Sequence, residues 1–321
     1  MIITVTINPA IDKTAGIETI HLRALNRLTR VEKDVGDQIR EFITVGGKGI
    51  IVSKAVAALG GSSTACGFLA GSTGRLIEEL LREKGITPDF IWVSGETRTN
   101  LKLVEPGGHL TEFNEQGPTV TEKELEALRD KLVSYATPGT IFVLAGSGCP
   151  GGPEDIYRQL ILAVKARGSR VFLDADGPLF AQAIEACPDV VKPNSFELAQ
   201  YFGLEREPSR QEILTLGRRL LEKGVGLVCV SMGGEGACFL TREGACFAPS
   251  LPGEVRSPVG AGDTMAAAVC YGLDQGKPLE ACFRLALAAS AGAVTTEGTK
   301  PPDRALVSQL EAQVTLTPVG V

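Results

Sequence analysis

One segment of the sequence, Gly260-Ala261-Gly262-Asp263, combines residue types that can act on a phosphate group. Its glycines let backbone N–H groups point toward one position at the start of the helical pattern over 265–273. That position would hold an anion or developing negative charge, with Asp263 beside it as a candidate base. A glycine-rich turn with a helix-capping aspartate has the same sequence, so the segment alone leaves both interpretations open.

A second glycine-rich loop, Gly46-Gly47-Lys48-Gly49, precedes an apolar helical pattern over 50–59. The glycines would allow a ligand to approach the main chain, and Lys48 supplies a positive charge for a phosphate or a hydroxyl group. The loop is not a Walker A motif, because that motif requires Ser or Thr directly after its lysine and Gly49 stands there. By itself the loop is a weak indication of a binding site.

A third segment places Asn194 and Glu197 three residues apart, where an apolar strand pattern gives way to a helical one. At this spacing both side chains lie on one face of a helix. A carboxylate and an amide could there order the water around Mg²⁺, which keeps several waters when it binds together with phosphates. An ordinary helix start uses the same residue types, so this segment also leaves two interpretations open.

A competing motif, G-x-G-x-x-G, occurs at Gly146, Gly148 and Gly151 after a predicted strand. With Asp174 at the end of the next strand, it has the outline of a dinucleotide-binding unit. However, Pro150 and the Gly-Pro pair after Gly151 keep the third glycine out of a helix interior, where this motif needs it for close packing. An NAD-linked oxidoreductase is therefore the weaker alternative.

Strand and helix patterns alternate behind these segments, which predicts βαβ units around a largely parallel sheet. Two capping boxes, Thr121 with Glu124 and Ser209 with Glu212, predict helices that end near residues 134 and 223. The predicted strands cover 140–144, 170–174, 189–192 and 226–230. Their carboxyl ends should meet at one edge of the sheet, where ligands bind in open α/β folds.

The N-terminal third follows a different pattern. Two stretches, 13–45 and 90–115, mix polar and β-branched residues without clear crossover helices, which predicts a small separate sheet. No tandem repeat or long linker divides the sequence. We therefore expect a single α/β domain over 1–321, with the small sheet forming a lid.

Composition argues against several classes of function. The 321 residues are 44% hydrophobic, enough for a large core, and the eight scattered cysteines form no C-x-x-C pair, which favours reduced residues in a cytoplasmic protein. A net charge of −6 gives no general attraction to phosphate backbones, so we expect no nucleic-acid partner. The start reads as a strand rather than a signal peptide, and no apolar stretch reaches the ~20 residues of a membrane span.

Taken together, the segments resemble the PfkB family of carbohydrate kinases over nearly the whole chain. The resemblance implies a ribokinase-like fold, which is a three-layer α/β sandwich with a mostly parallel central sheet and a small β-sheet lid that often forms a homodimer. Six motifs occur in the family's order: Thr6-Ile-Asn-Pro-Ala-Ile-Asp12, Gly46-Gly-Lys-Gly49, Thr97-Arg-Thr-Asn100, Lys192-Pro-Asn194 with Glu197, Ser231-Met-Gly-Gly-Glu-Gly-Ala237 and Gly260-Ala-Gly-Asp263.

The same resemblance implies roles for individual residues. Asp263 would be the catalytic base, with the amides of Gly260, Ala261 and Gly262 facing the transferred phosphoryl group. Asp12 would bind sugar hydroxyls, whereas Arg98 and Lys48 would bind the substrate phosphate. Further substrate contacts would come from Gly46, Gly47 and Ser147, ATP contacts from Lys192, Asn194, Ser231, Gly233 and Gly236, and water-mediated magnesium contacts from Asn194 and Glu197.

The sequence departs from the family pattern in the loop around Ser147, where the usual S-G-S-x-P-P-G appears as Ala145-Gly-Ser-Gly-Cys-Pro-Gly151. Two further departures matter more. Ile51 stands where the family's G-G-K-G-x-N motif has an asparagine that contacts the sugar, which removes a donor and an acceptor from the pocket. Residues 36–45 form an insertion relative to the family pattern, in the middle of the predicted lid. Both departures concern the side of the site that would bind the sugar.

Within the family, the N-P-A-I-D start, Arg98 and the segment 110–115 are similar to the 1-phosphofructokinase and tagatose-6-phosphate kinase branch. The resemblance implies ATP- and Mg²⁺-dependent phosphorylation of a ketose phosphate, with fructose 1-phosphate converted to fructose 1,6-bisphosphate. Tagatose 6-phosphate or another sugar or nucleoside is the alternative substrate. A non-catalytic sensor of sugar phosphates or nucleotides is the alternative of another class, motivated by Ile51, although such a sensor would not need Asp263.

Overall fold

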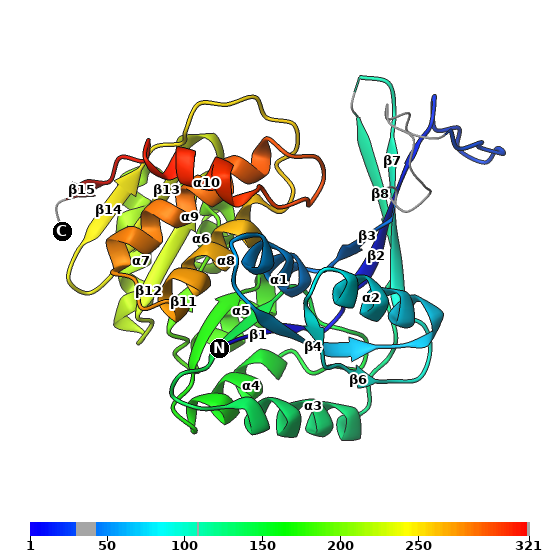
Figure 1. Ribbon diagram of the computed structural model, residues 1–321, viewed down its shortest axis with the longest axis horizontal. Helices are drawn as coiled ribbons and strands as arrows, with labels where there is room; N and C mark the ends of the chain where they lie inside the picture. The colour runs from blue at the N-terminus through cyan, green and yellow to red at the C-terminus, as the bar shows by residue number, and fades with distance from the viewer. Residues whose placement is uncertain (30–42, 108, 320–321) are drawn as a thin grey trace.

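The computed structural model describes residues 1–29, 43–107 and 109–319 of the chain. They form a large sheet with helices on both faces and a smaller sheet that projects from this body (Figure 1). The chain enters the large sheet with β1 (Ile2–Thr6), a fully buried run of apolar and β-branched residues. It continues almost at once into β2 (Ala10–Gly16) of the smaller sheet. A connection of only three residues therefore joins the two sheets.

Parallel strands form most of the large sheet, which confirms the predicted α/β class. The spatial order is β15-β14-β13-β12-β11-β10-β9-β1-β4-β5, and β6 pairs with β4. Pairing is parallel from β12 across to β5 and antiparallel from β12 outward to β15. The remaining strands are β4 (Ser63–Leu69), β5 (Thr87–Pro88), β6 (Ile91–Trp92), β9 (Ile141–Ala145), β10 (Arg170–Asp174), β11 (Val190–Val191), β12 (Leu227–Ser231), β13 (Ala237–Leu240), β14 (Ala245–Ala248) and β15 (Thr317–Val319).

Successive side chains of the buried strands face opposite sides, so the sheet separates two cores. Ile3 and Val5 pack in the core covered by α3 to α7, whereas Ile2 packs in the core covered by α1, α8, α9 and α10. This arrangement gives the three layers that the ribokinase-like fold requires. The helices are α1 (Lys48–Ala58), α2 (Gly71–Glu83), α3 (Glu122–Tyr135), α4 (Ile156–Lys165), α5 (Gly177–Ile184), α6 (Ser195–Tyr201), α7 (Arg210–Glu222), α8 (Ala261–Asp274), α9 (Leu279–Val294) and α10 (Arg304–Glu311).

Both predicted capping boxes are present. The hydroxyl groups of Thr121 and Ser209 accept hydrogen bonds from the backbone N–H groups of Glu124 and Glu212, and those glutamates accept in return from the capping residues. Each box satisfies N–H groups that the first helical turn leaves unpaired. None of the helices in the described part of the chain combines the length and the apolar character needed to span a bilayer.

The smaller sheet contains β3 (Ile43–Gly46), β2, β7 (Arg98–Val104) and β8 (Leu110–Asn114) in that spatial order. Its bounds differ from the predicted 13–45 and 90–115. It begins at Ala10, and β6 pairs with β4 of the large sheet, so the stretch 90–97 is not part of it. Residues 30–42, which include most of the predicted insertion at 36–45, lie outside the described residues.

Candidate active site

The segment 260–263 opens helix α8 at the centre of the molecule. Gly260 is the residue before the helix and has a φ of 82°, a left-handed conformation that favours glycine. The helix begins at Ala261, four residues earlier than the apolar pattern over 265–273 indicates, so the unpaired N–H groups of its first turn belong to the motif itself. Asp263 lies in this first turn and is buried, with 8% of its surface exposed. The structure thus places the candidate base at a helix N-terminus.

A second buried carboxylate, Asp174, lies at the end of β10. Its two oxygens are each 3.1 Å from an ammonium group, that of Lys48 at the start of α1 and that of Lys192 after β11. Burial works to raise the pKa of Asp174, but Lys192 and Lys48 outweigh it and hold that pKa below its ordinary value. The carboxylate therefore remains charged and fixes both lysines. Sequence reasoning missed this role, because it considered Asp174 only as part of the competing dinucleotide motif.

The same cluster sets the protonation of Asp263. Burial and the nearby charge of Asp174 raise the pKa of Asp263 to about 7, although Lys192 and Lys48 act in the opposite direction. Burial tends to lower the pKa of Lys48, but Asp174 leads the neighbouring carboxylates that raise it. A carboxyl group with a pKa near neutral pH is well suited to accept a proton from an attacking hydroxyl group. We call Asp174, Asp263, Lys48 and Lys192 the transfer cluster.

A cavity of about 500 Å³ borders the transfer cluster at the start of α8. It gathers most of the predicted nucleotide contacts, and one of its sides is apolar and formed largely by α9 and the loop before α8. The purine ring of a nucleotide could pack on this apolar side while the phosphates of the same nucleotide face the glycines. The lining includes Asn194, Ser231, Gly233, Gly236, Ala261, Gly262, Leu251, Val255, Leu287 and Val294. Lys192 lies beside the cavity, since a Cβ at Gly262 would be 3.1 Å from its ammonium nitrogen.

Asn194 and Glu197 begin helix α6. The side-chain oxygen of Asn194 accepts from the backbone N–H of Glu197 at 2.8 Å, and one carboxylate oxygen of Glu197 accepts from the backbone N–H of Asn194 at 2.9 Å. This capping box is the ordinary helix start that the sequence left open as one interpretation. The box engages one oxygen of Glu197. The charge of Glu197 also helps to raise the pKa of Lys48 and the pKa of Asp263.

Arg98 and Asp12 meet at the base of the smaller sheet. One terminal nitrogen of Arg98 donates to the backbone oxygen of Asn8 at 2.9 Å. Burial lowers the pKa of Arg98 and the charge of Asp12 opposes this shift, so the two side chains are close enough to interact. A Cβ at Gly46 would lie 2.7 Å from a carboxylate oxygen of Asp12, which explains the glycine at this position. Arg98 and Asp12 form a second charged region. We call it the lid cluster, after the lid that the sequence predicted for the smaller sheet.

Ser147 and Ile51 lie close to the two glycine-rich segments. Ser147 is exposed in the loop after β9, and a Cβ at the neighbouring Gly146 would lie 3.8 Å from Lys48. Ile51 is buried, and its Cγ2 lies 3.6 Å from the position of a Cβ on Gly260. Gly151, the third glycine of the competing dinucleotide motif, lies in a turn before α4 and not inside a helix.

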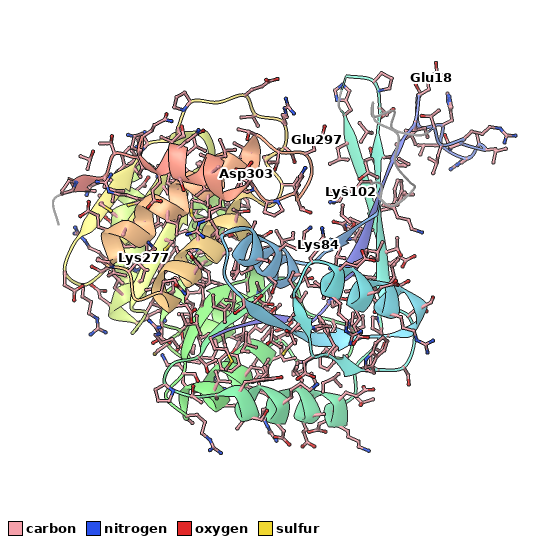
Figure 2. All side chains as sticks on the ribbon, viewed as in Figure 1. Glu18, Lys84, Lys102, Lys277, Glu297 and Asp303 are labelled. Carbon is pink, nitrogen blue, oxygen red and sulfur yellow. The ribbon has the colours of Figure 1, made fainter. Side chains whose placement is uncertain are left out.

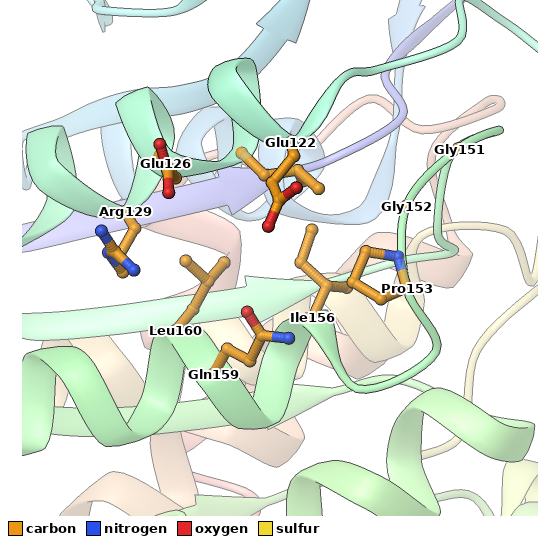
Figure 3. Close-up of a pocket in the computed structure, with 10 residues that line it drawn as sticks. Glu122, Glu126, Arg129, Gly151, Gly152, Pro153, Ile156, Gln159 and Leu160 are labelled. Atoms are coloured by element: carbon orange, nitrogen blue, oxygen red, sulfur yellow. The ribbon is translucent and has the colours of Figure 1, made fainter.

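Another hollow of about 500 Å³ lies between α3 and α4 (Figure 3). Glu122, Glu126 and Arg129 of α3 face Gln159 and Leu160 of α4 across it. None of the predicted site residues lines this hollow. The predicted site residues lie instead in the two charged clusters and around the cavity beside α8, which together form the candidate active site.

Comparisons with known proteins give consistent results. The pattern of the pfkB family carbohydrate kinases matches residues 16–305. The 1-phosphofructokinase of Bacillus subtilis (strain 168) is 36% identical over 317 residues, which cover 99% of each chain, and that of Escherichia coli (strain K12) is 30% identical over 98% and 97% of the chains. The structure of phosphofructokinase-2 from Escherichia coli in complex with potassium superposes with a TM-score of 0.88, at 28% identity, over 97% of this chain and 98% of that one. This chain belongs to the pfkB family of carbohydrate kinases.

Proposed function

We propose that this protein is a 1-phosphofructokinase, which transfers the γ-phosphoryl group of ATP to fructose 1-phosphate and forms fructose 1,6-bisphosphate. The observation that carries the proposal is the position of Asp263, a buried carboxyl group with a raised pKa at the N-terminus of α8. It belongs to the transfer cluster and directly follows Gly262, which lines the cavity beside α8, here called the nucleotide cavity. The names of full-length relatives support the choice of fructose 1-phosphate.

In this proposal, Asp263 accepts the proton of the attacking sugar hydroxyl group. The hydroxyl oxygen forms a bond to the γ-phosphorus while the bond to the β-phosphate oxygen breaks, and ADP leaves. Backbone N–H groups at the start of α8 and the charges of Lys48 and Lys192 stabilise negative charge on the transferred group. Positioning and electrostatics of this kind carry most of the catalysis in phosphoryl transfer.

Mg²⁺ fits this proposal as an ion bound mainly by ATP and water. Among the described residues, no group of three or more His, Cys, Asp or Glu side chains could hold a metal ion. Glu197 has a carboxylate oxygen outside the capping box, and Asn194 lines the nucleotide cavity. The two residues could thus contact metal-bound water, and the ion would neutralise charge on the ATP phosphates.

We further propose that the smaller sheet closes over the sugar and pairs with a second copy of the chain in the cytoplasm. Leu110 and Phe113 of β8 are about half exposed, and Leu22 and Leu25, in the segment after β2, are more exposed still. Apolar side chains on a projecting sheet favour a protein partner. Escherichia coli phosphofructokinase-2 has been solved in a tetrameric inhibited form, which supports self-association as a property to test.

A coupled ADP-release assay tests the proposed activity. The purified protein would be supplied with ATP, Mg²⁺ and one candidate acceptor at a time: fructose 1-phosphate, fructose 6-phosphate, tagatose 6-phosphate, fructose or ribose. We expect the highest kcat/KM with fructose 1-phosphate and a bisphosphate product by mass spectrometry. Preference for tagatose 6-phosphate or a free sugar would replace the proposed substrate. ATP binding without turnover of any acceptor would favour the sensor alternative.

A further inference from the structure

Three polar side chains of β7, Arg98, Asn100 and Lys102, alternate along the strand and therefore share one face of the smaller sheet. Asn100 pairs in register with Asp12 of β2. The amide of Asn100 donates to one carboxylate oxygen of Asp12 at 2.9 Å, and the ammonium group of Lys102 donates to the other at 3.2 Å. Asp12 thus lies between Lys102 and Arg98, whose Cα atoms are roughly 13 Å apart along the strand.

Lys102 is more sheltered than a typical surface lysine, because only 16% of its side chain is exposed. Its ammonium nitrogen also lies 3.8 Å from a carboxylate oxygen of Glu112 on β8. Figure 2 shows Lys102 on the projecting sheet, and the structure assigns it no place in the transfer cluster. An ammonium group has three donors, so one remains for a ligand even while Asp12 and Glu112 are both engaged.

Two further atoms on this face indicate a ligand that both accepts and donates hydrogen bonds. The Nε of Arg98 and the side-chain oxygen of Asn100 are buried and have no hydrogen-bond partner among the described residues. Buried polar groups are almost always paired in folded proteins, and an unpaired one commonly marks a functional site. A phosphate ester would accept from Arg98, and a sugar hydroxyl group would donate to Asn100.

The other lysine expected near the substrate phosphate, Lys48, is engaged elsewhere. Its ammonium group lies 3.1 Å from Asp174, and the charges that raise its pKa belong to Asp174, Glu197 and Asp263. In fructose 1-phosphate the phosphate is on C1 and the hydroxyl group to be phosphorylated is on C6, at the opposite end of the molecule. Lys48 is therefore better placed for the transferred phosphoryl group, and the smaller sheet is the place to look for a second cation at the phosphate end.

We propose that Lys102 is a substrate-binding and specificity-determining residue, the second cation of the sugar-phosphate subsite beside Arg98. This inference rests on the proposed function and assigns the residue that separates phosphorylated from free ketoses. When a sugar hydroxyl group donates to Asp12, Lys102 can turn a donor toward the phosphate, and Arg98 binds the same group through its unpaired Nε. A free sugar has no anionic group for Lys102 to bind, so Lys102 adds nothing to the affinity for free sugars.

The test compares Lys102→Ala, Lys102→Gln and Lys102→Arg with the wild type. We expect KM for fructose 1-phosphate to rise about 10- to 100-fold in Lys102→Ala and Lys102→Gln, as for the loss of a charge-assisted contact. KM for ATP and kcat/KM for free fructose should change less than about twofold. Lys102→Gln keeps a donor for Asp12 and so tests the charge even where the alanine variant folds poorly. Lys102→Arg keeps the charge and should recover most of the affinity.

Lys13→Ala is the matched control, since Lys13 is an exposed lysine of β2 next to Asp12 in sequence. It should leave both sugar substrates unaffected. An equal loss with fructose 1-phosphate and with fructose would show that Lys102 only neutralises Asp12, and no loss with either would also overturn the inference. Failure of the proposed function is distinguishable, because the wild-type protein itself would then prefer another acceptor or turn over none.

Discussion

The transfer cluster and the lid cluster use buried charge in different ways. Asp174 is almost inaccessible at the end of a central parallel strand, and two lysines hold it. Asp12 lies on a small sheet, where an amide and the partly exposed Lys102 contact it. Deep burial shifts proton affinity, as the raised pKa of Asp263 shows. The smaller sheet leaves donors and acceptors unpaired for a ligand. Rate and recognition should therefore respond to different mutations.

Removing the proposed base, Asp263, should produce the largest difference between the two clusters. In Asp263→Asn the side chain keeps its size but cannot accept a proton, so we expect kcat to fall ~10²- to 10⁴-fold. Affinity for ATP and for fructose 1-phosphate should stay within a few fold of the wild type. Asp130→Asn, on the exposed face of α3, is a control that should have no effect. A variant that keeps more than half of the wild-type kcat would refute the assignment of Asp263.

Arg98→Ala should produce the opposite pattern. Losing a charge-assisted contact of ~1.5 to 3 kcal/mol would raise KM for fructose 1-phosphate about 10- to 150-fold, with little change in KM for ATP. Steady-state kinetics with each substrate varied in turn would show the split. Arg82→Ala, which removes an exposed arginine of α2, serves as the control. If KM for ATP rises instead, Arg98 belongs to the nucleotide side and the comparison fails.

The pH dependence should report the transfer cluster alone. Asp263 must be unprotonated to act as a base, and its pKa is raised to about 7, so kcat/KM should rise with pH up to that value and fall about tenfold per unit below it. The rising part of this profile is its acid limb. Asp174→Asn removes a negative charge beside Asp263 and frees two lysines, so the pKa of Asp263 should fall and the acid limb should move to lower pH. Arg98→Ala should leave the limb in place. A limb that moves equally in both variants would contradict the separation of the clusters.

The smallest expected effect concerns Lys54, a buried lysine of α1 whose ammonium group donates to Thr299 at 3.2 Å. Burial lowers its pKa to about 8, with a further contribution from Lys84. Between about pH 8 and 10.5 the unfolded chain therefore binds more protons at Lys54 than the folded chain does. Below pH 8 the folded chain carries the buried charge, so the full cost of burying it lowers the free energy of unfolding. We expect Lys54→Met to raise the free energy of unfolding by roughly 1 to 2 kcal/mol at pH 7.

The benefit of Lys54→Met should shrink as the pH rises through this window, because the wild type then loses the buried charge. Urea denaturation at pH 7 and pH 10 would measure it, with the exposed Lys277 changed to Met as the control. A variant that is less stable than the wild type at both values would show that the hydrogen bond to Thr299 outweighs the cost of burial.

The sequence predicted the central sheet and its helices well, because their signals are local. The capping boxes at Thr121 and Ser209 mark helix starts directly, and short apolar runs mark the buried strands. The smaller sheet was predicted with less accurate bounds. The stretch 90–97 has the composition of the smaller sheet, but its strand residues Ile91 and Trp92 pair with β4 of the large sheet, and only the three-dimensional pairing decides this.

Glycine-rich motifs led directly to Asp263 and to the nucleotide cavity, since a turn needs particular residue types at fixed spacing. Asp174 and Lys102 could not be assigned in the same way. Each contacts partners distant in sequence: Asp174 pairs with Lys48 and Lys192, and Lys102 pairs with Asp12. A single charged residue at the end or on one face of a strand carries no motif, so its role follows only from the folded arrangement.

The central claim is that the lid cluster recognises the substrate phosphate independently of phosphoryl transfer. Equilibrium binding of sugars to the inactive variant Asp263→Asn tests this claim most directly. Asp263→Asn would be titrated by calorimetry with fructose 1-phosphate and with fructose, and so would the double variant Asp263→Asn/Arg98→Ala. We predict that Asp263→Asn binds the ester at least about 10-fold more tightly than the free sugar, and that the double variant loses most of this preference. Equal affinity for ester and free sugar in Asp263→Asn would contradict the central claim.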